Sequence, residues 1–148
     1  KGFEKGTMHL VDSDEQTNLL NSLEKEYGKP SLACGGSATN TIFAASILGS
    51  SCSYICKVGN DKNGNFYLDD LSDAGVNIDH SVMLDSNINS GTCTVMVSPD
   101  AERTMSTCLG ITDGTNNPPS EAVPEAKIFS KEASLASPLV LTYFIYLD

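Results

Sequence analysis

Residues 34–49 read CGGSATNTIFAASILG, a stretch that places two adjacent glycines, a serine and an asparagine around the start of an apolar run. The apolar residues from about 38 to 48 predict a buried helix that Gly49 closes. Two interpretations of the glycines before this helix are open. Either they serve only a turn between a strand and the helix, or they let backbone amides come close to a ligand.

The segments that follow alternate between strand and helix signals. SYICKV (53–58) is a short apolar run that predicts a buried strand. Residues 59–75 predict a helix, with Asp61 as its N-cap and Gly75 at its end, and VNID (76–79) leads back toward a strand. This alternation predicts a layered α/β fold with a mostly parallel sheet.

A further helix precedes the glycine pair, over residues 13–28. Ser13 and Gln16 have the spacing of a capping box, leucines recur on one face, and Gly28 suits the C-terminal cap. These signals predict an amphipathic helix over residues 13–28.

The pattern changes in the second half of the chain. Residues 81–109 contain three short β-prone runs, and in the middle run, GTCTVMVS (91–98), the side chains alternate between two faces. Pro99 and the aspartate after it predict a tight reversal, and so a hairpin. Residues 112–127 are rich in turn formers and predict a loop, whereas ASPLVLTYFIYLD (136–148) predicts a core strand or a partner-binding edge strand.

Charge and composition limit the classes of function. The 148 residues carry nine basic and nineteen acidic side chains, a formal net charge of −10, which disfavours binding to nucleic acid. No apolar run is long enough for a membrane span. The five cysteines are odd in number and scattered, which is typical of reduced thiols in a cytoplasmic protein. With only two histidines, no zinc site is expected.

Three stretches together resemble one known family. GGSATNT (35–41), KVGNDKNGNFYLDDLSDAGVN (57–77) and SGTCTVMVSPDAERTMSTCLG (90–110) are similar, in order and spacing, to the PfkB (ribokinase-like) sugar and nucleoside kinases. KGTMHLVD (5–12) resembles the adenosine-kinase-like branch in particular. The resemblance implies an α/β fold, with a ribokinase-like mostly parallel sheet flanked by helices and a small antiparallel β lid, present here as a partial domain. It divides the chain into a core, residues 1–80 and 110–148, and a lid, residues 81–109.

The resemblance also implies a reaction and a set of site residues. Such kinases move the γ-phosphoryl group of ATP, with Mg²⁺, to a hydroxymethyl group of a sugar or nucleoside. The glycines would approach the sugar ring, the asparagine would bond its hydroxyls, and the first hairpin strand would cover it. The residues that match these substrate-binding positions are Gly35, Gly36, Ser37, Asn40, Thr92 and Cys93. Arg103 matches a family arginine on the phosphate side.

Two parts of the family pattern are not found in this sequence. The first strand, with an Asp that grips sugar hydroxyls, is expected before Lys1, and the second signature, DTxGAGD with the catalytic base, does not occur between residues 112 and 148. No catalytic residue is therefore assigned, and the ATP and Mg²⁺ sites are expected largely outside this chain. We expect the N-terminal part of a kinase that is inactive alone. The alternative is a non-catalytic binding or oligomerisation module, which would form a homodimer through the lid or through exposed sheet edges.

Overall fold

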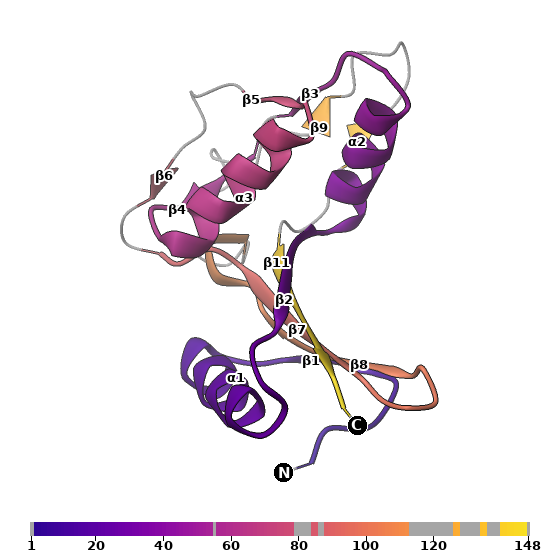
Figure 1. Cartoon of the computed structure of the whole chain (residues 1–148). Helices are drawn as coiled ribbons and strands as arrows, with labels where there is room; N and C mark the ends of the chain where they lie inside the picture. Colours follow the sequence, from indigo (N-terminus) through magenta and orange to yellow (C-terminus); the bar gives the residue numbers. More distant parts are fainter. Residues whose placement is uncertain are drawn as a thin grey trace.

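Short strands and three helices alternate along the chain in a computed structural model (Figure 1), which describes residues 2–54, 56–78, 84–85, 88–112, 126–127, 134–135 and 140–147. The helices are α1 (Ser13–Tyr27), α2 (Ser37–Ile47) and α3 (Lys62–Asp73), and a short 3₁₀ turn spans Gly110–Thr112. The longer strands are β1 (Met8–Leu10), β2 (Ser31–Gly35), β7 (Thr92–Val97), β8 (Arg103–Cys108) and β11 (Val140–Tyr146). The two-residue strands are β3 (Ser53–Tyr54), β4 (Val58–Gly59), β5 (Asn77–Ile78), β6 (Leu84–Asp85), β9 (Ala126–Lys127) and β10 (Ser134–Leu135).

The helix ends follow local capping chemistry. The side chain of Asp12, the N-cap of α1, accepts a hydrogen bond from the Glu15 amide at 2.8 Å, and Gly28 closes the helix at φ 87°. The predicted capping box of Ser13 and Gln16 is wrong, because Asp12 takes that role and Gln16 is buried against the sheet. None of the helices within the described ranges is long and apolar enough to cross a membrane.

The predicted single strand over residues 53–58 is wrong in one respect. The structure describes two short strands there, β3 and β4, and each pairs in parallel with a different partner, β5 and β6 respectively. Because the two halves have different partners, they do not form one continuous ladder. The predicted return to a strand after α3 is confirmed by β5.

A five-stranded sheet in the order β1-β8-β7-β11-β2 forms the largest layer. β1 with β8 and β7 with β11 are parallel, whereas β7 with β8 and β11 with β2 are antiparallel. The predicted hairpin is therefore confirmed as β7–β8, and the predicted core strand near the C-terminus is confirmed as β11, which lies between β7 and β2. With the parallel pairs β3–β5 and β4–β6, the described sheets are mixed, mostly parallel and flanked by helices, as the sequence predicted.

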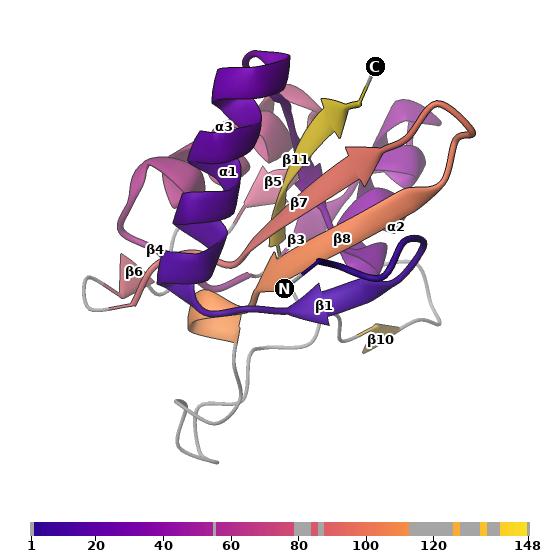
Figure 2. The same ribbon diagram turned by 90° about the horizontal axis from the view of Figure 1, so that it is seen from below.

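Helix α1 packs against the five-stranded sheet, whereas α2 and α3 lie together beside the short strands β3 and β5 (Figures 1 and 2). Leu23 of α1 packs with Met96 of β7 and Ile145 of β11 in one apolar cluster. A larger cluster lies between α2, α3 and the short parallel strands, with Ile42, Tyr54 and Leu71 fully buried. Two apolar clusters thus hold the helices, one under α1 and one between α2 and α3.

The hairpin that was predicted as a separate lid shares its sheet with strands from both ends of the chain. β8 pairs with β1 and β7 pairs with β11, so the hairpin forms the centre of this layer. The division into a core of residues 1–80 and 110–148 and a lid of residues 81–109 stays a prediction.

Candidate functional site

The glycine pair forms a sharp turn between β2 and α2. Gly35 is buried at the end of the strand, and Gly36 is the N-cap of the helix at φ 102° and ψ 147°. This backbone conformation is essentially restricted to glycine, because a Cβ atom would clash with the backbone there. No side-chain hydrogen bond caps α2 within the described part of the chain, so the amides of its first turn are open to another acceptor.

A buried cluster of hydroxyl groups supports this turn from below. Thr39, fully buried in the first turn of α2, shares hydrogen bonds through its Oγ1 with the hydroxyls of Tyr54, at 3.2 Å, and Tyr67. The Tyr67 hydroxyl also lies 3.5 Å from the Gly35 carbonyl oxygen, to which it can donate. Burial raises the pKa of both tyrosines, so these hydroxyls stay protonated and can donate at neutral pH. The sequence patterns do not predict this cluster; the signal that could have found it is Tyr67, which lies on the buried face of α3.

A second hydrogen-bonded cluster joins α3 to the loop before β7. Asp61, the N-cap of α3 as predicted, accepts from the Gly64 amide at 2.7 Å, the Ser90 amide at 2.7 Å and the Ser90 hydroxyl at 2.9 Å. The Gly59 amide donates to Ser90 Oγ at 3.0 Å. We call Gly59, Asp61, Gly64 and Ser90 the α3 clamp. It fixes the point at which β7 begins.

The strand register brings the glycine turn and the start of β7 to one end of the sheet. Gly35 is paired with Val140, while Cys34 and Thr92 both face Leu141 from opposite sides of β11. One strand spacing on each side of β11 therefore separates β2 from β7 at this end. Two predicted residues of α2, Ser37 and Asn40, are exposed in its first turn, next to the same end of the sheet.

Thr92 and Cys93 do not face the same space. Successive side chains of a strand point to opposite faces, as the sequence alternation predicted. Thr92 lies on the face covered by α1, the side on which Gln16 bonds Thr94, whereas Cys93 accepts a hydrogen bond from Thr107 on the other face at 3.3 Å. The two side chains therefore cannot line one pocket, although both were predicted to bind substrate.

Arg103 lies far from these residues. It is the exposed first residue of β8 and pairs with Val97 at the far end of β7, whereas Thr92 pairs with Cys108. The length of the hairpin separates Arg103 from the glycine turn. Its role on the phosphate side stays a prediction.

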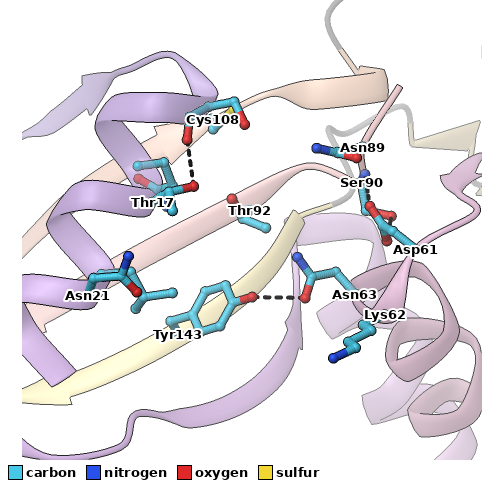
Figure 3. Close-up of a pocket in the computed structure, with 13 residues that line it drawn as sticks. Thr17, Asn21, Asp61, Lys62, Asn63, Asn89, Ser90, Thr92, Cys108 and Tyr143 are labelled. Carbon is cyan, nitrogen blue, oxygen red and sulfur yellow. Dashed lines mark hydrogen bonds between the residues drawn. The ribbon is translucent and has the colours of Figure 1, made fainter. Parts of the chain in front are cut away.

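A cavity of about 370 Å³ opens between α1 and the first turn of α3, and we call it the α1–α3 pocket (Figure 3). Strands β7, β8 and β11 form its floor through Thr92, Cys108 and Tyr143. The Tyr143 hydroxyl donates to Asn63 Oδ1 at 2.8 Å and so links β11 to the first turn of α3. Of the predicted substrate-binding residues, Thr92 alone is among those that line this pocket.

The chemistry of the described residues does not provide a metal site. Among them, no three His, Cys, Asp or Glu side chains come together in a way that could hold a metal ion. All five cysteines are free thiols, and burial raises the pKa of Cys56 to about 12. Burial and then the neighbouring Asp70 carboxylate raise the pKa of Cys34. The Cys34 and Cys56 thiols are therefore neutral at physiological pH and are poor nucleophiles. No chemical step is therefore assigned to the described residues.

Comparison with known proteins identifies the family. Residues 7–144 match the profile described as pfkB family carbohydrate kinase. This chain belongs to the PfkB family. A ribokinase from Dictyostelium discoideum is 34% identical over 82 residues, which are 55% of this chain and 26% of that protein. The fold and the order of motifs are therefore those that the resemblance implied.

Solved structures of adenosine kinases have a similar arrangement. The adenosine kinase from Sinorhizobium meliloti matches with 33% identity and a TM-score of 0.62, over 74% of this chain and 32% of that one. The adenosine kinase from Anopheles gambiae matches with 18% identity and a TM-score of 0.64, over 80% of this chain and 34% of that one, and shows the fold alone. The chain thus spans about a third or less of the length of these relatives.

Proposed function

We propose that this PfkB chain is the N-terminal, substrate-side part of an ATP-dependent kinase that phosphorylates a hydroxymethyl group of a sugar or nucleoside. The observation that carries the proposal is the glycine turn. Gly36 has a backbone conformation that excludes side chains, and the uncapped first turn of α2 begins beside it. Open amides without neighbouring Cβ atoms suit the close approach of a sugar hydroxyl.

The other residues predicted to bind substrate fit this role to different degrees. Asn40 and Ser37 are exposed in the first turn of α2, where an amide and a hydroxyl can both donate to and accept from sugar hydroxyls. Cys93 lies near the same end of the sheet, on the face away from α1. Thr92 lies on the α1 face, so it would not share a substrate pocket with Cys93.

Binding of a small neutral substrate tests the role of the turn. We expect adenosine or D-ribose to shift the backbone amide signals of Ser37 and Asn40 in ¹H–¹⁵N spectra of the 148-residue chain. Gly36→Ala should remove these shifts, since alanine is strained at φ 102° and its Cβ atom blocks the approach. Gly49→Ala is the matched control, because Gly49 has φ 88° at the other end of α2 and no atom within 4 Å of an added Cβ. Equal binding by the Gly36→Ala variant would overturn the proposal.

We infer further that the chain does not transfer phosphoryl groups unaided. No catalytic base or metal-holding set is assigned among its described residues, and the chain spans only part of the length of its relatives. In a coupled ATP-consumption assay with adenosine and with ribose, the chain should give background rates. Turnover above background with either substrate would contradict this inference.

An oligomerisation module is the second candidate, and one feature favours it. β1 is an edge strand of the five-stranded sheet, and its Met8 and Leu10 side chains are 57% and 64% exposed. Exposed apolar edge strands are sites of association between chains. Light scattering separates the candidates: a homodimer that binds no nucleoside favours the module, whereas a monomer that binds nucleoside speaks against it.

We also propose a cytoplasmic location and a small-molecule ligand as the partner. The five free thiols support a reducing compartment. The formal net charge of −10 disfavours nucleic acid as a partner.

A further inference from the structure

The α1–α3 pocket has no part in the proposed function. It lies on the face of the sheet that α1 covers, whereas Cys93 lies on the opposite face. We propose that this pocket is a second binding site, and that it takes a neutral polyhydroxylated molecule of about the size of a monosaccharide. This inference is independent of the substrate role proposed for the glycine turn.

The charges in the pocket wall indicate a neutral ligand. Among the described residues that line it, Asp61 and Lys62 are the only ones with Asp, Glu, Lys, Arg or His side chains. The Asp61 carboxylate already accepts three hydrogen bonds within the α3 clamp, so it does not require a cation from a ligand. Lys62 is exposed at the rim, where solvent screens its charge. The strongly negative chain further disfavours an anionic ligand.

The remaining polar groups match hydroxyl groups. Thr92 is 8% exposed, and it is one of the residues that line the pocket. Asn63 keeps its amide donors, because only its Oδ1 is used by Tyr143. Asn21 and Asn89 add amides at the rim. Amides and hydroxyls each supply donors and acceptors, as the hydroxyls of a sugar do.

The walls are ordered before a ligand arrives. Gln16 Nε2 donates to Thr94 Oγ1 at 3.0 Å and to the Ser106 carbonyl at 3.2 Å, and its Oε1 accepts from the Ser106 hydroxyl at 2.7 Å. These bonds fix one wall, and the bond between Tyr143 and Asn63 fixes another (Figure 3). A preorganised site loses less entropy when it binds a ligand.

The size of the pocket and its apolar surface complete the match. A volume of about 370 Å³ is near the lower end of small-molecule sites and is too small for a dinucleotide. Leu20 and the ring of Tyr143 supply apolar surface for the C–H face of a sugar.

A spectroscopic titration tests the proposal with D-ribose as the probe and ribose 5-phosphate as the charged comparison. We expect D-ribose to shift the side-chain amide signals of Asn63 and Asn89 in the ¹⁵N-labelled chain, and the phosphate ester to bind more weakly. Thr92→Val removes one hydroxyl with little change of shape, so affinity should fall about tenfold, the loss of one hydrogen bond. Tyr143→Phe, which releases Asn63, should also weaken binding.

Two controls separate this site from the glycine turn. Thr107→Val removes a buried hydroxyl from the neighbouring strand on the opposite face and should leave the Asn63 and Asn89 shifts unchanged. Gly36→Ala should also leave them unchanged. If D-ribose shifts only Ser37 and Asn40, the second site is overturned and the proposed function stands. If D-ribose shifts only the pocket amides, and adenosine also leaves Ser37 and Asn40 unshifted, the second site stands and the proposed function fails.

Discussion

Thr39 shows how one side chain can organise the candidate site. Its hydroxyl joins those of Tyr54 and Tyr67 inside the α2–α3 cluster, and the Tyr67 hydroxyl reaches the Gly35 carbonyl. A residue with no exposed surface thus holds the turn on which the proposed substrate site depends.

Removal of this hydroxyl should destabilise the chain. We expect Thr39→Val to lower the free energy of unfolding by about 1–3 kcal/mol, because two buried tyrosine hydroxyls lose a partner. Thr41→Val is the matched control on the same helix, since Thr41 is exposed and donates only to the Ser37 carbonyl. Its effect should stay within about 0.5 kcal/mol. Urea denaturation measures the free energy of unfolding of both variants. Equal losses for Thr39→Val and Thr41→Val would contradict the role of the hydroxyl cluster.

The cysteines allow a test of burial at single residues. Burial raises the pKa of Cys34, Cys56 and Cys93, so these thiols should react with iodoacetamide much more slowly than Cys108, which is half-buried beside the pocket. Mass spectrometry after labelling at about pH 8 gives the order in which the thiols react. In urea, where the chain is unfolded, all five cysteines should react at similar rates. Fast labelling of Cys56 in the folded chain would contradict its burial.

The raised cysteine pKa values also predict how the stability of the chain changes with pH. A folded-state pKa above the unfolded value means that the unfolded chain loses its thiol protons first as pH rises. The free energy of unfolding should therefore fall as pH increases beyond about 8.5, the ordinary cysteine pKa. A stability that stays constant between about pH 8 and pH 10 would speak against these shifts.

At the scale of elements, the α3 clamp couples the start of one helix to the start of one strand. A Cβ atom on Gly64 would lie 2.1 Å from the Gly59 carbonyl oxygen and 2.9 Å from Ser90 Oγ. The glycine is therefore required by close packing between α3 and the loop before β7. Composition and spacing predicted Asp61 as the N-cap, but Ser90, 29 positions away, could not be found from local patterns.

Whether replacement of Gly64 by alanine raises or lowers stability depends on the α3 clamp. Alanine at an open helical position would stabilise the chain by about 0.5–1 kcal/mol. At Gly64 the contact with backbone reverses this, so Gly64→Ala should instead destabilise the chain by about 1–3 kcal/mol. Asn65→Ala, at the exposed neighbouring position, should be neutral or slightly stabilising. Thermal unfolding compares the two variants, and a stabilised Gly64→Ala variant would show that the clamp is absent.

At the scale of the whole molecule, β11 joins the two ends of the chain. It pairs in parallel with β7 and antiparallel with β2, and Ile145 packs under α1 with Leu23 and Met96. Without this strand, β2 and β7 would each present an unpaired edge.

Deletion of residues 140–148 should therefore abolish cooperative unfolding and cause association. Circular dichroism during heating and light scattering measure these two effects. Tyr146→Ala is the control, since this side chain on the same strand is 64% exposed and its loss leaves the ladder intact. A truncated chain that stays monomeric and unfolds in one sharp transition would contradict the central role of β11.

The sequence by itself determined the features that depend on neighbours along the chain. The three helices, the Asp61 cap, the Gly28 end and the hairpin follow from spacings of a few residues, because capping and periodicity act over one or two turns. The family resemblance came from motifs of the same local kind. Only the tertiary structure decided that Gly35 pairs with Val140 and that Gln16 turns inward to bond Thr94. Strand order and register join residues far apart in the chain, and their free energy comes from burial that no local pattern records.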